Sequence, residues 1–304
     1  MTNEIRLKNI SVPEGSVDVV LDTDAYNEID DQFAISYMLR CKEKLNTKAI
    51  YAAPFFNSNS SGPADGMEKS YDEIIKLLSL LNEDIEVFKG AHAFLENEST
   101  PIMSPAVLDL VERAKQYSPE KPLYVVAIGA ITNVASAILA DPSIVENIVV
   151  VWLGGNATHY HNTKEFNMMG DIAAARVVME SGVPFVQLPC KGVVSSFCIS
   201  KPELEFWLVG KNPLADYLAT NTIKAAESYA ANTAWTRCIW DVTAVAWLMN
   251  DKNRFMESRT IPAHKPTYDH FYEPAESGVE IRYIYNIRRD ALMNDLIKRL
   301  IEDK

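Results

Sequence analysis

Short runs of Val, Ile and Leu recur along the chain as far as residue 188, and a longer amphipathic stretch follows each run. A strand that is apolar at successive positions is buried on both faces, which is typical of parallel sheets with crossover helices. The pattern therefore predicts an α/β fold with an open, mainly parallel sheet flanked by helices. The expected strands are residues 17–21, 48–52, 123–128, 148–153 and 184–188.

Helical periodicity between these runs predicts helices at residues 30–40, 66–81, 104–117, 132–139, 171–180 and 241–249. After about residue 200 the rhythm changes: residues 202–229 read as helical, 279–285 as a late strand and 289–301 as a closing helix. No Gly/Ser-rich linker and no internal repeat interrupts the chain. We therefore expect a single domain over residues 1–304, with a helical C-terminal elaboration.

The formal charge of −12 disfavours nucleic acid as a partner, because affinity for a phosphate backbone comes largely from Lys and Arg. A small neutral or weakly charged ligand fits this composition better.

Residues 1–16 are polar, and no later run approaches the roughly 18 apolar residues of a membrane span, so no membrane partner and a cytoplasmic location are expected. The cysteines show no CxxC spacing and are interpreted as buried thiols in a reducing compartment: Cys41, Cys190, Cys198 and Cys238.

Five acidic residues lie within ten positions directly after the first expected strand: Asp22, Asp24, Glu28, Asp30 and Asp31. In an open α/β sheet, this position faces the crevice at the carboxyl ends of the strands, where ligands bind. Converging carboxylates repel one another unless a cation neutralises them, and a set of oxygen ligands suits Ca²⁺ or Mg²⁺. In the alternative interpretation, the last two acids only cap the following helix.

The order Asp22-Thr23-Asp24 … Ile29-Asp30-Asp31 … Ala34 resembles the signature of the inosine-uridine type nucleoside hydrolases, which usually reads DTDPGIDDA. Here residues 25–28 replace the Pro-Gly pair, so the loop is two residues longer. The resemblance implies a Rossmann-like nucleoside hydrolase fold and Ca²⁺-dependent hydrolysis of ribonucleosides to ribose and free base. It also implies that Asp24 is the general base and that Asp24, Asp30 and Asp31 bind the metal.

Three later segments match the same family in the same order. The segment Val126-Ala127-Ile128-Gly129-Ala130-Ile131-Thr132-Asn133 resembles the strand-to-helix segment whose backbone carbonyl, here that of Ile128, completes the metal site. The segments Gly154-Gly155-Asn156 and Glu165-Phe166-Asn167 resemble those whose side chains hold the ribose hydroxyls, which implies roles for Asn156, Glu165 and Asn167. In the segment Trp240-Asp241-Val242-Thr243, Asp241 resembles the last metal carboxylate.

Trp240 occupies the place where pyrimidine-preferring and broad-specificity members carry a His that protonates the leaving base. A Trp there resembles the purine-specific branch, in which the indole stacks on the base, so purine nucleosides are expected to be favoured. The alternative is a core aromatic packed with Trp247.

The resemblance also suggests further substrate contacts: Asn57 to the sugar, Phe56 (or Phe55) to the base, and Tyr229, Trp235 and Arg237 on a closing loop. Arg237 is either the missing donor to the leaving group or a surface ion-pair partner.

Other interpretations remain open at this level. A ribosyl-binding protein without turnover would keep the same metal and sugar residues. A phosphatase of the haloacid dehalogenase type also begins with DxD after a strand, but it requires downstream residues in a different order. His159 and His161 suggest zinc only weakly, because no third ligand accompanies them. Related enzymes are dimers or tetramers, so a homodimer or homotetramer is expected.

Overall fold

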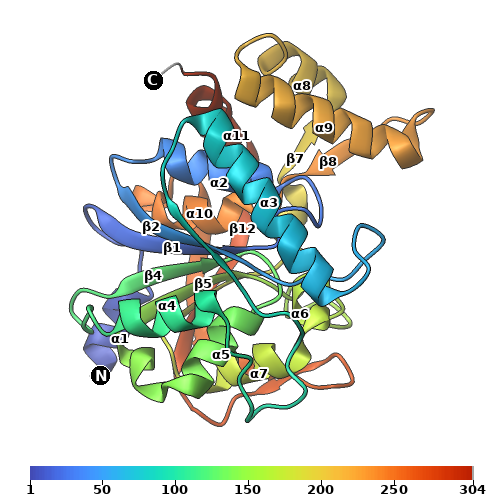
Figure 1. Ribbon diagram of the computed structural model, residues 1–304. Coiled ribbons are helices and arrows are strands. Elements are labelled where there is room, and N and C mark those ends of the chain that lie inside the picture. Colours follow the sequence, from blue (N-terminus) through green and yellow to red (C-terminus); the bar gives the residue numbers. More distant parts are fainter. Residues whose placement is uncertain (303–304) are drawn as a thin grey trace.

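Eight strands form the main sheet, in the order β3-β2-β1-β4-β5-β6-β12-β9, in the computed structural model, which describes residues 1–302 (Figure 1). Neighbouring strands are parallel except for the antiparallel pair of β12 and β9. The expected open, mainly parallel sheet is thereby confirmed. The strands are β1 (Val17–Thr23), β2 (Leu45–Ala52), β3 (Glu86–Lys89), β4 (Leu123–Ala127), β5 (Ile148–Leu153), β6 (Phe185–Leu188), β9 (Met256–Pro262) and β12 (Glu280–Ile287).

Both faces of the sheet are buried, which explains why the central strands are apolar at successive positions. In β1, Val19 and Leu21 enter one core while Val20 enters the other. Helices α2 (Asp31–Arg40), α3 (Pro63–Leu81), α10 (Val242–Leu248) and α11 (Arg289–Ile301) contribute to the first core. The second core contains residues of α4 (Pro105–Ala114), α5 (Thr132–Ala140) and α7 (Ile172–Glu180). Figure 1 shows the sheet between these two helical layers.

The expectation of one helical stretch at residues 202–229 is only partly met. The structure has two helices there, α8 (Lys201–Trp207) and α9 (Pro213–Ala230). Gly210 adopts φ +76°, which ends regular helix, and the Asn212 side chain caps the next helix by accepting from the N–H of Ala215 at 2.8 Å. The late strand and the closing helix are present as β12 and α11.

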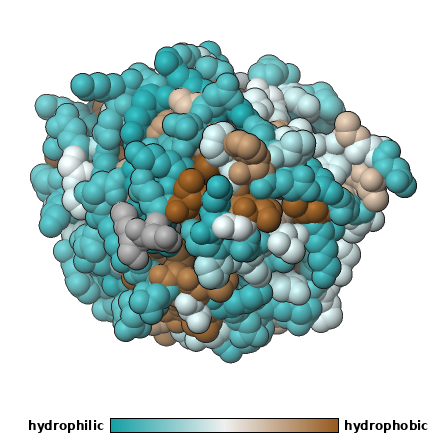
Figure 2. Space-filling model, turned by 90° about the horizontal axis from the view of Figure 1, so that it is seen from above, coloured by the Kyte–Doolittle hydropathy of each residue, from teal (hydrophilic) through white to brown (hydrophobic). Residues whose placement is uncertain are grey.

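Several elements were not expected from the sequence. They are α1 (Asn3–Asn9), α6 (Phe166–Gly170), the edge strands β3 and β9, and the two-stranded ribbons of β7 (Cys198–Ser200) with β8 (Thr236–Cys238) and β10 (His264–Pro266) with β11 (Tyr272–Pro274). Strands of three residues carry too little periodicity to be recognised locally. Helices α8 and α9 and the β7–β8 ribbon form one end of the molecule, and the view from above shows a mostly hydrophilic surface with separate apolar groups (Figures 1 and 2). No helix within residues 1–302 combines the length and apolar character needed to cross a bilayer.

The strand order places a crevice at the middle of the sheet. From β1 the chain builds outward through β2 to β3, and then returns to place β4, β5 and β6 on the other side of β1. The helix after β1 (α2) and the helix after β4 (α5) therefore lie on opposite faces of the sheet. An open α/β sheet binds its ligands at such a switch point, beyond the carboxyl ends of the strands. The acidic segment lies at this position, because Asp24 directly follows β1.

Candidate active site

A cavity of about 260 Å³ opens at the carboxyl ends of the central strands. Its walls come from segments that follow β1, β4, β5 and β6 and from the start of two helices, α2 and α10. This arrangement gathers residues that are far apart in the sequence. The lining residues are Asp24, Asn27, Glu28, Asp30, Asp31, Ile128, Leu153, Lys164, Glu165, Phe166, Asn167, Cys190, Lys191, Trp240 and Asp241.

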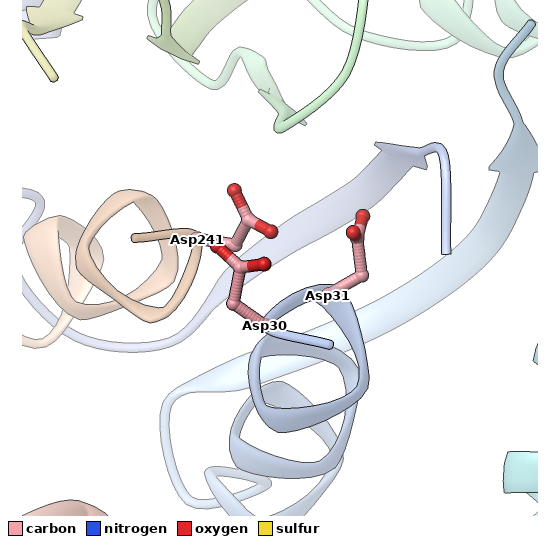
Figure 3. Close-up of side chains that lie close together, drawn as sticks. All are labelled: Asp30, Asp31 and Asp241. Atoms are coloured by element: carbon pink, nitrogen blue, oxygen red, sulfur yellow. The ribbon is translucent and has the colours of Figure 1, made fainter. Parts of the chain in front are cut away.

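Three buried carboxylates converge in this cavity. Asp30, Asp31 and Asp241 each offer an oxygen, and these atoms lie within 4.8 Å of one another. Figure 3 shows them at the first turns of α2 and α10. The Thr23 hydroxyl donates to Oδ1 of Asp31 at 2.5 Å, and the Trp240 backbone N–H donates to Oδ2 of Asp30 at 3.1 Å. Both helix N-termini add a partial positive charge that favours carboxylates at these positions.

Burial dominates the electrostatics of these acids. It raises the pKa of Asp30 to about 8 and that of Asp31 to about 7, with a further increase from the charge of Glu28. Burial and then the neighbouring carboxylates hold the pKa of Asp24 and of Asp241 well above the usual range. The cluster is therefore costly to ionise by itself, and a bound cation would compensate its charge.

Asp24 has an oxygen available for chemistry or for a ligand. Its Oδ2 is buried and makes no hydrogen bond to any part of the chain that the structure describes. Gly129, just after β4, lies close to the same carboxylate, since a Cβ added to Gly129 would lie 2.9 Å from Oδ1 of Asp24. A buried carboxylate oxygen without a partner is unfavourable unless a ligand occupies the space before it.

The donor set matches a hard divalent cation. Asp24, Asp30, Asp31 and Asp241 line one cavity together with Ile128, whose backbone carbonyl follows the end of β4. Oxygen ligands of this kind suit Ca²⁺, which takes about six to eight oxygen atoms. The orphaned Oδ2 of Asp24 and the cluster of three carboxylates therefore fit a metal ion at this position.

Asp22, the first acid of the cluster, serves a different purpose. Its Oδ1 accepts from the side-chain amide of Asn133 at 2.7 Å, and it does not line the cavity. The Oδ1 of Asn133 in turn accepts from the backbone N–H of Ala91 at 2.7 Å. Burial raises the pKa of Asp22 to about 7. This pair ties β1 to the start of α5 beneath the cavity.

Glu165 and Asn167 form the opposite wall. The Glu165 carboxylate accepts from three backbone N–H groups, those of Gly155, Asn167 and Met168, at 2.8 to 3.0 Å. The side-chain amide of Asn167 donates to the carbonyls of Ile128 and Leu153, both at 3.0 Å. These contacts hold both side chains rigidly against the ends of β4 and β5.

The comparison with known families decides what kind of protein carries this cavity. A family model described as inosine-uridine preferring nucleoside hydrolase matches residues 19–282. The chain belongs to this nucleoside hydrolase family. Enzymes of the family are glycosidases, so the expected enzyme class is confirmed. The match also shows that the alternative of a phosphatase of the dehalogenase type is wrong.

Individual relatives of the family resemble this chain over most of its length. The non-specific ribonucleoside hydrolase RihC of Salmonella paratyphi A (strain ATCC 9150 / SARB42) is 26% identical over 260 residues, covering 77% of this chain and 79% of its own. The plant nucleoside hydrolase PpNRh1 superposes with a TM-score of 0.73 at 18% identity, covering 96% of this chain and 100% of its own. The purine-preferring ribonucleoside hydrolase from Gardnerella vaginalis gives 0.70 at 20% identity, covering 93% and 98%. These superpositions show the nucleoside hydrolase fold.

The structure brings most of the family residues inferred from the sequence to the cavity wall. They are Asp24, Asp30, Asp31, Ile128, Glu165, Asn167, Trp240 and Asp241. Their individual roles stay predictions. The sequence segments that carry them are separated by up to about 200 residues, and the parallel sheet unites them because its strands end at one edge.

Five other residues inferred as substrate contacts do not line the cavity: Asn57, Asn156, Phe56, Tyr229 and Arg237. The Asn57 amide donates to Oδ1 of Asn27 at 2.6 Å, and it is Asn27 that lines the cavity. Asn156 is fully buried and is occupied by contacts to two loops. Phe56 is 58% exposed and Tyr229 65% exposed, so neither packs on this site.

Arg237 also stops short of the cavity because it is held by Glu28, which does line it. Burial alone would lower the pKa of Arg237, but the charges of Glu28 and Asp30 raise it overall. The guanidinium therefore keeps its proton and is unsuited to act as the acid for a leaving base. The interpretation of Arg237 as an ion-pair partner is the one that matches the structure.

Sequence reasoning missed seven wall residues: Asn27, Glu28, Leu153, Lys164, Phe166, Cys190 and Lys191. Two signals were present. Cys190 and Lys191 follow the carboxyl end of β6, where parallel strands present ligand-binding residues, and Leu153 ends β5. Asn27 and Glu28 belong to the two-residue expansion after Asp24, so the departure from the family pattern is itself part of the cavity wall.

Proposed function

We propose that this chain uses calcium to hydrolyse the N-glycosidic bond of ribonucleosides, and that it cleaves purine nucleosides faster than uridine. The observation that carries the proposal is the convergence of Asp30, Asp31 and Asp241 in the same cavity as the unpartnered Oδ2 of Asp24. Membership of the nucleoside hydrolase family supports the reaction class. Trp240 at the cavity wall supports the preference for purines.

Calcium would be held by Asp24, Asp30, Asp31, Asp241 and the carbonyl of Ile128. A divalent ion at this position supplies positive charge that lowers the pKa of a neighbouring water molecule and keeps the acids ionised. The chain contributes rigidity, because Thr23 holds Asp31 and the Trp240 backbone holds Asp30.

Asp24 is the residue proposed to take the proton from the attacking water. Its buried Oδ2 makes no hydrogen bond within the described chain and has two lone pairs, so it could contact a metal ion through one and accept that proton through the other. The water oxygen bonds to the anomeric carbon as the bond from that carbon to the base nitrogen breaks. Positive charge then develops on the sugar ring, and the surrounding carboxylates stabilise it.

Glu165 and Asn167 are proposed to hold the ribose hydroxyls. The Glu165 carboxylate already accepts three backbone N–H groups, yet its oxygens have lone pairs enough to accept from a hydroxyl as well. Burial raises the pKa of Glu165, and the backbone N–H groups counteract this by stabilising the charged form. The sugar would thus meet acceptors whose positions are set before it binds.

Trp240 is proposed to stack on the leaving base. Its side chain is only partly buried against the core, and its backbone is fixed by Asp30, so the indole stands at the wall beside the carboxylates. Stacking orients a purine and excludes water from the bond that breaks. A purine offers a larger ring surface than uracil, which is the basis of the expected preference.

Ribose release tests the proposal. Purified protein with calcium should release reducing sugar from inosine, adenosine or guanosine faster than from uridine, and a chelator should abolish the activity until calcium is restored. Asp24→Asn should lose about 10³-fold or more in kcat while retaining the wild-type circular dichroism spectrum. The exposed Asp269→Asn serves as the matched control. A protein that binds nucleosides without releasing ribose would instead be a ribosyl-binding protein.

A further inference from the structure

Two lysines, Lys164 and Lys191, line the cavity. The side chains of Lys164 and Lys191 are exposed at its wall, and within residues 1–302 neither ammonium group lies within 4.0 Å of a carboxylate oxygen. The same cavity is lined by six carboxylates, and a single divalent ion leaves this acidic floor with excess negative charge; the six are those of Asp24, Glu28, Asp30, Asp31, Glu165 and Asp241. An anionic substrate is repelled by such a floor unless cations at the wall compensate its charge.

A buried amide holds the two lysine-bearing loops together. The Oδ1 of Asn156 accepts from the backbone N–H of Lys191 at 3.3 Å, and its Nδ2 donates to the carbonyl of Asn162 at 3.1 Å. The Oδ1 of Asn162 accepts from the backbone N–H of Lys164 at 2.9 Å. The carbonyl of Lys191 accepts from the N–H of Ala157 at 2.9 Å. Both lysine backbones are thus fixed relative to one side chain that is fully buried.

We propose that Lys164 and Lys191 recognise a phosphate monoester on the ribosyl part of the substrate, as in a nucleoside 5′-monophosphate. This inference rests on the proposed N-ribosyl hydrolysis and extends it to a charged substrate class. Lysine ammonium groups bind phosphate as compact charges, and two of them match the dianion present near neutral pH. The reaction is unchanged: water adds to the anomeric carbon, the bond to the base nitrogen breaks, and the products are the sugar phosphate and the base.

The test compares a purine nucleoside with its 5′-monophosphate, using wild type, Lys164→Gln and Lys191→Gln with calcium present. The ratio of kcat/KM for the nucleotide to that for the nucleoside should fall about tenfold or more in each variant, mainly through KM. Rising salt should lower the same ratio in the wild type. Lys211→Gln is the matched control, because Lys211 is exposed and lies outside the cavity wall.

Binding to the Asp24→Asn variant, measured by calorimetry, separates this inference from the proposed reaction. If that variant binds the nucleotide more tightly than the nucleoside, and each lysine substitution removes the difference, the phosphate site stands even if no turnover is observed. Equal losses for both ligands would show that the lysines only balance the acidic floor, and would overturn the inference. The inference would also be overturned if the wild type cleaves the nucleoside but Asp24→Asn binds the nucleotide no more tightly than the nucleoside.

A second, independent feature is the pairing of Cys198 with Cys238. These residues are register partners in the antiparallel ribbon of β7 and β8. The N–H of Ile239 donates to the carbonyl of Phe197 at 2.9 Å, so the cysteines occupy the adjacent, non-hydrogen-bonded position. The Cα atoms of such a pair are about 4.5 Å apart, within the range of about 4.4 to 6.8 Å for a disulfide. A bond between the sulfur atoms therefore requires no change in the backbone.

The two thiols differ in the way that a reactive pair requires. Cys198 is partly exposed, and a hydrogen bond from Cys238 together with the charges of Arg289 and Arg237 lowers its pKa to about 6. Cys238 is buried, and burial raises its pKa. One thiolate that an oxidant can reach thus faces one protonated thiol.

We further infer that Cys198 and Cys238 form a reversible modification site that hydrogen peroxide converts to a disulfide. The Cys198 sulfur attacks one peroxide oxygen, the O–O bond breaks, and a sulfenic acid and water form. The Cys238 sulfur then attacks the sulfenic sulfur, the S–O bond breaks, and a second water leaves. The two thiols lose two electrons and the peroxide gains them, so no other reactant is needed.

Peptide mapping of the full chain after mild peroxide treatment tests this site. A linked pair of peptides containing Cys198 and Cys238 should appear, and a thiol reductant should remove it. The bond would close a loop that contains α8 and α9, so oxidation should raise the Tm by several degrees in wild type but not in Cys198→Ser or Cys238→Ser. Formation of sulfinic or sulfonic acid on Cys198 without a linked peptide would refute the inference.

Discussion

The side-chain amide of Asn167 donates a hydrogen bond to the backbone carbonyl of Ile128 over 3.0 Å. A carbonyl oxygen has two lone pairs, so this contact orients the oxygen while leaving the other lone pair for a metal ion. We therefore expect Asn167→Ala to weaken calcium binding about tenfold to a hundredfold, because partners that orient metal ligands commonly have effects of this size. Calorimetric titration with calcium measures the change. Asn46→Ala, a surface amide paired with Asp18, is the control, and equal affinities in both variants would contradict the expectation.

Gly129 is expected to be indispensable to the position of Asp24. A Cβ at this residue would lie 2.9 Å from Oδ1 and 3.0 Å from Cγ of Asp24, so Gly129→Ala must displace the carboxylate. We predict a loss of about a hundredfold or more in kcat, since displacement of a reacting group by about 1 Å can have this effect. Steady-state ribose release is the measurement. Gly62→Ala, where no atom lies within 4 Å of the added Cβ, should retain near wild-type activity.

Trp240 is expected to set the preference among bases. Trp240→Ala removes the proposed stacking surface, so the kcat/KM for inosine should fall by about tenfold, with a smaller effect for uridine. Trp240→Phe keeps an aromatic face and should recover part of the loss. Equal reductions for the two nucleosides would indicate that the indole mainly supports the Asp30 backbone contact and does not bind the base.

The acid cluster predicts opposite effects of pH with and without calcium. Burial raises the pKa of Asp30 to about 8 and that of Asp31 to about 7 from an ordinary value of 3.8. At a pH between the ordinary pKa of 3.8 and the raised pKa values, the carboxyl groups of Asp30 and Asp31 stay protonated in the folded chain but are ionised in the unfolded chain. The free energy of unfolding of the metal-free protein should therefore fall as pH rises from about 4 to about 8.

Calcium requires ionised ligands, so it should raise the Tm more at pH of about 8 than at about 5. Differential scanning calorimetry in chelator and in calcium measures both effects. A Tm in chelator that rises steadily over this range would show that other groups control the stability.

Asn133 is expected to matter for stability through the contacts it makes beneath the cavity. Its amide donates to Asp22 at 2.7 Å and its Oδ1 accepts from the N–H of Ala91 at 2.7 Å. Asn133→Ala leaves both buried groups without these partners, so the free energy of unfolding should decrease by about 2 kcal/mol or more. Urea denaturation provides the measurement. Asn97→Ala, at an exposed turn, should change stability much less.

Much of the architecture could be predicted because it depends on local patterns. The apolar runs that became β1, β4 and β5 read as strands buried on both faces, and both cores confirm this. The break between α8 and α9 was missed although Gly210 and Pro213 mark it, because an amphipathic pattern continues on both sides. Edge strand β3 was missed because it is short and only half-buried, which leaves little hydrophobic contrast.

By itself, the sequence determined the two helical layers around a parallel sheet and the acid-rich segment after its first strand, since hydrophobic periodicity and the order of residues are local properties. The tertiary structure brought Asp241 to Asp30 and Asp31, as the family resemblance implied. It alone decided that Asn156 contacts two loops instead of lining the cavity, and that Lys191 lies at the same wall as Lys164. The reason is physical. Strand ends that converge at one sheet edge bring together side chains regardless of their separation along the chain, and which donor meets which acceptor there depends on packing that no local pattern encodes.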